Sequence, residues 1–182
     1  SSTKCFPRKQ DRMMKNVIVT VLTVFIVGAA SAAAQSKKTI ILVRHAEKVV
    51  AAADDKTGDV DLTSDGRDRA IRFAKVAKRF RPGEIFSTAY KRTRQTAEPI
   101  AKLRGKEIQT YDASKHPELI DRILKSKTKR FVIVGHSNTV PFLANLLAKK
   151  EIFRQLPDTE YGVIYVIRIT NGVFKRLEIY PY

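Results

Sequence analysis

Cysteine is almost absent from this chain of 182 residues, and the only one is Cys5. It precedes an apolar stretch, Val17 to Ala30, that has the character of an export signal. Once such a segment is removed, the mature protein contains no thiol. The composition therefore excludes a disulfide framework, a cysteine nucleophile and thiolate metal sites.

A long hydrophobic run is also missing. A membrane-spanning helix needs about 20 apolar residues, whereas residues 17–30 supply 14. Small alanines follow, as in a signal peptide, and favour cleavage before Gln35 or two residues earlier. We therefore expect upstream sequence and a signal peptide in residues 1–34, one domain in residues 35–182, and export to the periplasm or secretion without stable membrane insertion. An uncleaved anchor is the alternative.

Negative charge is scarce, because 18 acidic residues face 35 lysines and arginines, for a net charge of +17. Such a surface attracts anions: phosphorylated small molecules, nucleic acid or acidic lipid. Aromatic residues are not interleaved with the basic runs as in proteins that bind single strands, and an exported protein seldom meets genomic DNA. We expect a small phosphorylated substrate and no nucleic-acid partner. The sequence makes no prediction of oligomeric state.

Short apolar runs rich in β-branched residues alternate with segments of helical period after residue 38. Strands are expected at 39–43, 84–88, 107–111 and 131–134, and helices at 64–80, 93–104, 117–127 and from 138 or 139 to 149. Two further strands, 161–170 and 173–180, flank Asn171-Gly172, a hairpin signal. This order predicts an α/β fold: a three-layer sandwich whose mostly parallel sheet has helices on both faces and a C-terminal antiparallel hairpin.

Two histidines follow the ends of expected strands. Arg44-His45 closes the first strand and Gly135-His136 closes a later one. Because ligands of open α/β sheets bind beyond the carboxyl ends of the strands, we expect both histidines in one site. The forked guanidinium of Arg44 suits phosphate oxygens. The predicted ligand is a phosphoryl group.

Four spaced motifs recur in order along the chain: Leu42-Val43-Arg44-His45-Ala46-Glu47, Leu62-Thr63 with Gly66-Arg67 and Ala70, Ser87 with Arg92 and Gln95-Thr96-Ala97, and Val134-Gly135-His136-Ser137. In this order they resemble the signatures of the histidine phosphatase (phosphoglycerate mutase-like) superfamily. The resemblance covers Thr39 to about Leu147. Ala46 departs from the glycine that is commoner after the first histidine.

The resemblance implies a covalent mechanism. His45 would attack phosphorus in line and become phosphohistidine, while Arg44, Arg92 and His136 hold the phosphoryl oxygens. Arg92 is preferred to its basic neighbours because it stands four residues before Thr96. A neutral imidazole is a competent nucleophile, and phosphoryl transfer needs positioning and positive charge around the oxygens. No cofactor and no metal are implied.

The proton donor for the leaving group has no clear motif. The mutase-like branch of the superfamily places a glutamate in the interval where this chain has Asp112, Glu118 and Asp121; the phytase-like branch uses an aspartate where it has Ser137. Asp112 is the first candidate acid because it ends a strand at the crevice side, and Glu118 is the second. Glu47 is a third, unless it orients a neighbouring arginine. Ser137 is expected to bind substrate through a helix start.

Four other readings compete with a phosphatase. Gly135 to Thr139 superficially resembles the motif of a serine hydrolase, but no histidine follows Ser137. A metal hydrolase would need a third ligand, and His116 stands in a charged loop that looks exposed. We therefore expect a metal-independent histidine phosphatase that hydrolyses phosphomonoesters. The alternatives are a phosphoglycerate mutase-like phosphotransferase and a non-catalytic binder of phosphorylated ligands.

Overall fold

A single six-stranded sheet organises the computed structural model, which describes residues 36–182. The elements are β1 Lys37–Arg44, α2 Ser64–Ala77 with the 3-10 turn η1 Lys78–Phe80, β2 Glu84–Ser87, α3 Lys91–Arg104, β3 Ile108–Thr110, α4 His116–Lys125, β4 Arg130–Gly135, α5 Thr139–Ala148, β5 Val163–Thr170 and β6 Val173–Pro181. The strand order is β3-β2-β4-β1-β5-β6. Strands β1 to β4 are parallel, and β5 and β6 are antiparallel.

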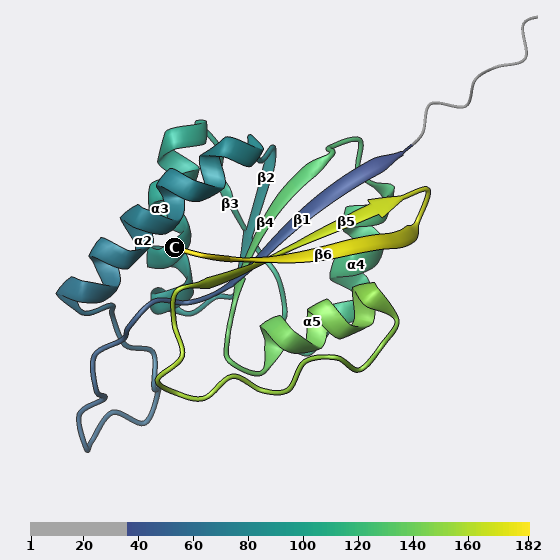
Figure 1. Cartoon of the computed structure of the whole chain (residues 1–182). Coiled ribbons are helices and arrows are strands. Elements are labelled where there is room, and N and C mark those ends of the chain that lie inside the picture. The colour runs from purple at the N-terminus through teal and green to yellow at the C-terminus, as the bar shows by residue number, and fades with distance from the viewer. Residues whose placement is uncertain (1–35) are drawn as a thin grey trace, which may run out of the picture. The chain divides into compact units, whose positions relative to one another are not determined.

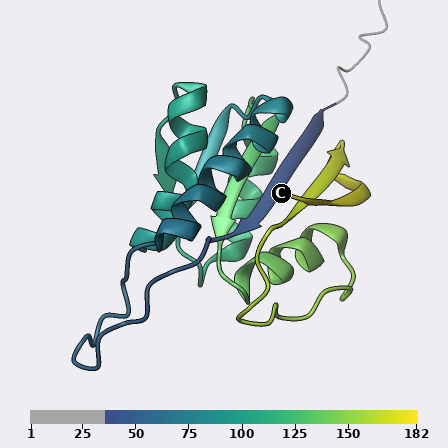
Figure 2. The same ribbon diagram turned by 60° about the vertical axis from the view of Figure 1, so that its left-hand side comes forward.

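Helices cover both faces of this sheet, as Figures 1 and 2 show. In β1, Ile41 and Val43 belong to the core cluster that includes Phe73 of α2. The alternate residues Ile40 and Leu42 belong to the opposite cluster, beneath α4 and α5. Successive strand residues point to opposite faces, so a strand covered on both sides is apolar throughout. The predicted three-layer α/β sandwich is confirmed.

Local signals set where α2 begins and where the C-terminal hairpin turns. Thr63 is the N-cap of α2, and its side chain accepts a hydrogen bond of 3.0 Å from the backbone N–H of Gly66. This bond satisfies one of the N–H groups that the first turn leaves free. At the far end of the chain, Asn171 and Gly172 both have positive φ and form the predicted hairpin turn between β5 and β6.

The predicted signal peptide in residues 1–34 and its cleavage point before Gln35 lie outside the described residues. Within residues 36–182, none of the helices has the length and apolar character to cross a membrane.

Candidate active site

Three adjacent parallel strands end side by side and deliver the candidate residues. Arg44 at the end of β1 pairs in register with Gly135 at the end of β4, and the backbone N–H of His45 donates to the carbonyl of Gly135 at 2.8 Å. Ser87 at the end of β2 pairs with the penultimate residue of β4. The residues after each strand, which include His45 and His136, therefore emerge at one edge of the sheet.

His45 is held as a neutral imidazole with one nitrogen available. Its side chain is 4% exposed, and Nδ1 lies 2.8 Å from the carbonyl oxygen of Ala46. A carbonyl oxygen only accepts, so Nδ1 carries the proton and Nε2 keeps its lone pair. Burial lowers the pKa of His45 to about 3, assisted by the positive charges of Arg44 and Arg92 and opposed by the Ala46 hydrogen bond.

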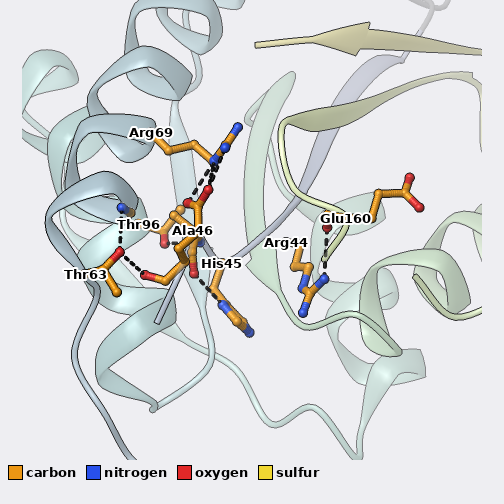
Figure 3. Close-up of polar contacts among 9 residues, drawn as sticks. Arg44, His45, Ala46, Thr63, Arg69, Thr96 and Glu160 are labelled. Carbon is orange, nitrogen blue, oxygen red and sulfur yellow. Dashed lines mark hydrogen bonds and ion pairs between the residues drawn. The ribbon is translucent and has the colours of Figure 1, made fainter. Parts of the chain in front are cut away.

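Ala46 ties this histidine to helix α3. Its backbone N–H donates to the Thr96 hydroxyl at 3.0 Å (Figure 3). That hydroxyl donates to the carbonyl of Arg92 at 2.7 Å. The Ala46 side chain is completely buried. The methyl group that replaces the commoner glycine is thus accommodated in the core, and two of the sequence motifs are physically joined.

His136 faces His45 across the site. Their ring centroids lie 5.5 Å apart with an interplanar angle of 67°. His136 Nε2 lies 3.0 Å from the Thr88 hydroxyl, and burial together with Arg92 and Arg44 lowers the pKa of His136 to about 4. Both imidazoles are therefore neutral near pH 7.

Each candidate arginine is stacked on a tyrosine. The guanidinium carbon of Arg44 lies 4.3 Å from the ring centroid of Tyr161, and that of Arg92 lies 4.2 Å from that of Tyr90. One terminal nitrogen of Arg92 donates to the carbonyl of Gly58 at 2.9 Å. The Nε atoms of both arginines are buried and have no partner among the described residues. Both arginines also line the pocket described next, where a planar, forked guanidinium suits an oxyanion.

These side chains surround a pocket of about 530 Å³. Its lining consists of Arg44, His45, Lys48, Tyr90, Arg92, Ala113, Ser114, His136, Ser137, Asn138, Thr139, Gln155 and Asp158. The structure thus brings together His45, His136, Arg44, Arg92 and Ser137, the expected phosphoryl-binding set. Three cationic side chains outnumber the one carboxylate in this lining, so the pocket attracts anions.

The family model described as histidine phosphatase superfamily (branch 1) matches residues 40–119. This range includes His45 and Arg92 and ends before His136. Across these residues the chain matches the histidine phosphatase superfamily. The resemblance read from the motifs is confirmed.

Solved structures of several phosphatases share this fold. A candidate phosphohistidine phosphatase, SixA, of Agrobacterium tumefaciens is 20% identical, with a TM-score of 0.62 over 80% of this chain and 98% of that one. The mycobacterial glucosyl-3-phosphoglycerate phosphatase Rv2419c is 13% identical, with a TM-score of 0.59 over 80% and 98%. A phosphoserine phosphatase mutant of Entamoeba histolytica is 16% identical, with a TM-score of 0.59 over 77% and 96%. No curated protein sequence matches the chain.

The candidate acids predicted from the sequence do not line the pocket. Asp112 and Glu118 line a separate hollow of about 170 Å³. The Asp112 carboxylate accepts hydrogen bonds from the backbone N–H and the hydroxyl of Ser114, which lower its pKa. Glu47 forms a two-oxygen contact with Nε of Arg69, at 2.7 and 2.8 Å. The structure therefore gives none of these carboxylates a contact with the phosphoryl pocket.

Several pocket residues were missed by the sequence reasoning. Gln155 and Asp158 lie in the irregular segment 149–162 between α5 and β5, where no motif or period marks them. Tyr90 precedes α3 and Lys48 follows the first motif. Proximity to the motifs was the only signal available for these two. No signal in the sequence pointed to Asp158.

His116, expected in an exposed loop, is instead the first residue of α4 and is 9% exposed. Its ring lies 4.9 Å from that of Phe142 in α5, because the start of α4 packs against that helix. Among residues 36–182, no group of three or more histidine, aspartate or glutamate side chains is arranged to hold a metal ion.

Proposed function

We propose that this histidine phosphatase superfamily member hydrolyses phosphomonoesters through a phosphohistidine on His45. The observation that carries the proposal is the state of that ring: neutral, fixed through Nδ1, with Nε2 making no protein hydrogen bond in a pocket lined by two arginines. A nucleophile that is neutral and pre-oriented needs no separate base to remove a proton before it attacks.

The first chemical step transfers the phosphoryl group. Nε2 of His45 forms a bond to phosphorus as the bond to the leaving oxygen breaks. Arg44 and Arg92, which line the pocket, offer guanidinium N–H groups to the oxygens on which negative charge spreads. His136, which lies edge-on to His45, is placed to contact the same oxygens. In the second step water attacks phosphorus and releases inorganic phosphate from His45.

Turnover and trapping experiments test this mechanism. We expect the protein to hydrolyse p-nitrophenyl phosphate, to be inhibited by vanadate, and to yield an acid-labile phosphoenzyme on rapid quenching. His45→Ala should abolish turnover and the phosphoenzyme. His116→Asn is the matched histidine control, because His116 does not line the pocket, and it should retain turnover once folding is verified. Normal turnover in His45→Ala would end the proposal.

The same experiments separate the two alternatives. A mutase-like phosphotransferase would return a rearranged phosphate ester from 3-phosphoglycerate rather than inorganic phosphate. A non-catalytic binder would hold phosphate without any turnover, and His45→Ala would then leave phosphate affinity nearly intact. Release of inorganic phosphate in step with loss of substrate supports hydrolysis.

Export is the second part of the proposal. It rests on the sequence of residues 13–34, in which a lysine precedes an apolar stretch that ends in alanines. Expression of the full chain in a bacterial host, followed by mass determination of the protein in the periplasm and the medium, tests it. A product that begins near Gln35 is expected. Retention of the uncleaved chain in the membrane fraction would favour the anchor.

A further inference from the structure

The carboxylate of Asp158 is the one acidic side chain that lines the pocket within the part of the chain described here. Its Oδ1 lies 3.5 Å from a terminal nitrogen of Arg44, and the side chain is 95% exposed on that rim. A carboxylate beside a phosphoryl-binding arginine has no obvious role in attracting an anion. Its position needs another explanation.

Arg44 fixes the backbone around Asp158. One of its terminal nitrogens donates to the carbonyls of Pro157 at 2.7 Å and Glu160 at 2.9 Å; Figure 3 shows the second of these bonds. Tyr161, which follows Glu160 in the chain, stacks on the same guanidinium. The 149–162 segment is therefore clamped to the arginine that also borders the pocket, and Asp158 cannot move far from it.

We propose that Asp158 is the proton donor to the leaving group and, after that group departs, the base that activates water. This inference rests on the proposed function and names the acid that the sequence did not reveal. A phosphoryl group bound to Arg44 would place its bridging oxygen near a carboxylate that the same arginine holds. His136 fits less well, because it is neutral at pH 7 and its Nε2 is bonded to Thr88.

The protons and bonds balance through both steps. The cycle begins with the Asp158 carboxyl group protonated, and the dianionic phosphoryl group competes with it for Arg44. As the N–P bond forms and the P–O bond breaks, the carboxyl proton moves to the departing oxygen and gives the free alcohol. Water then gives its proton to the Asp158 carboxylate as its oxygen bonds to phosphorus and the N–P bond breaks.

The dependence of rate on leaving-group basicity distinguishes a proton donor from a structural residue. Asp158→Asn removes the proton but keeps the shape, so kcat/KM should fall by about 100-fold for phenyl phosphate, whose leaving phenol has a pKa of about 10 as in tyrosine. For p-nitrophenyl phosphate, whose leaving group is stable without a proton, the loss should be less than about tenfold. Asp158→Glu should recover part of the phenyl phosphate activity.

Glu151→Gln is the matched control, because it removes one charge from an exposed position of the same segment outside the pocket. It should change neither rate by more than about twofold. Equal losses of kcat/KM for both substrates in Asp158→Asn, or no loss, would overturn the assignment. Failure of the proposed function itself is distinct, since His45→Ala would then retain turnover of both substrates.

Discussion

Gly66, in the first turn of α2, lies directly against the backbone of Glu47, two residues after the candidate nucleophile. A methyl group at position 66 would overlap the carbonyl oxygen of Glu47. That carbonyl also accepts the backbone N–H of Thr63 at 2.9 Å. The start of α2 and the chain that leaves β1 are thus packed in backbone contact, and the position of His45 depends on it.

Replacement of Gly66 by alanine should therefore displace the chain around His45. Overpacking of a close backbone contact typically costs about 1–3 kcal/mol of unfolding free energy, and we expect kcat/KM to fall by at least about tenfold. Urea unfolding and turnover of p-nitrophenyl phosphate measure the two effects. Asp68→Ala, at an exposed position of the same helix, is the control and should leave both nearly unchanged. A stable, fully active Gly66→Ala would show that the contact relaxes freely.

The choice of Arg92 among three neighbouring basic residues can be tested by charge-conserving changes. Arg92→Lys keeps the charge but loses the buried Nε–H donor and the stack on Tyr90, so kcat/KM should fall by about 100-fold. Arg94→Lys is the matched control, because Arg94 is exposed and donates to Thr110 outside the pocket. It should retain activity within about threefold. The reverse ranking of the two variants would move the phosphoryl site away from Arg92.

Thr88 is expected to orient His136. Its hydroxyl lies 3.0 Å from His136 Nε2 and 2.8 Å from the Thr93 hydroxyl, so that both hydroxyls and the imidazole form one chain of hydrogen bonds. Thr88→Val keeps the volume and removes the hydroxyl. We expect kcat/KM to drop by about tenfold, the equivalent of one hydrogen bond.

The control for that variant is Thr110→Val, which removes a hydroxyl at the end of β3 outside the pocket. It should cost little activity. If the two valine variants behave alike, the contact between Thr88 and His136 has no influence on catalysis.

The buried state of His45 also makes stability depend on pH. The folded protein keeps this ring neutral down to about pH 3, whereas the unfolded chain protonates it near pH 6.5. The unfolded state therefore binds more protons below pH 6.5, and the free energy of unfolding falls as the pH decreases toward 3. At pH 5 this one group lowers the free energy of unfolding by roughly 2 kcal/mol relative to neutral pH.

His45→Asn should remove that contribution. Urea unfolding at pH 7 and pH 5 should show a smaller acid loss in the variant than in the parent protein, with Arg94→Lys as a variant that keeps the parental pH dependence. Parallel curves for His45→Asn and the parent would mean that His45 titrates normally in the folded state.

The fold was readable from the sequence because its core strands are covered on both sides. Ile40 to Val43 are all completely buried, so the run is apolar without interruption, and Thr63 is the N-cap of α2. Because short connections keep consecutive strands and helices next to each other, a chain that alternates between them can adopt few topologies. The predicted positions of His45 and His136 follow from the same rule, because both come directly after parallel strands.

The candidate acid could not be read in this way. Asp112 follows a strand, as a residue aimed into the site would, but its carboxylate turns back to Ser114 and stays out of the pocket. Asp158 comes from a segment with no regular structure, whose path is set by contacts between Arg44 and carbonyls more than 110 residues away in the chain. Sequence pattern carries no record of such contacts.

The sequence alone therefore determined the order of strands and helices and the pair of histidines at the strand ends, because hydrophobic period and turn chemistry are local properties. The tertiary structure decided which side chains complete the wall of the pocket: Tyr90, Gln155 and Asp158 rather than Asp112 and Glu118. The reason is that a loop follows the long-range hydrogen bonds and stacking contacts that hold it, and these form only when the sheet is assembled.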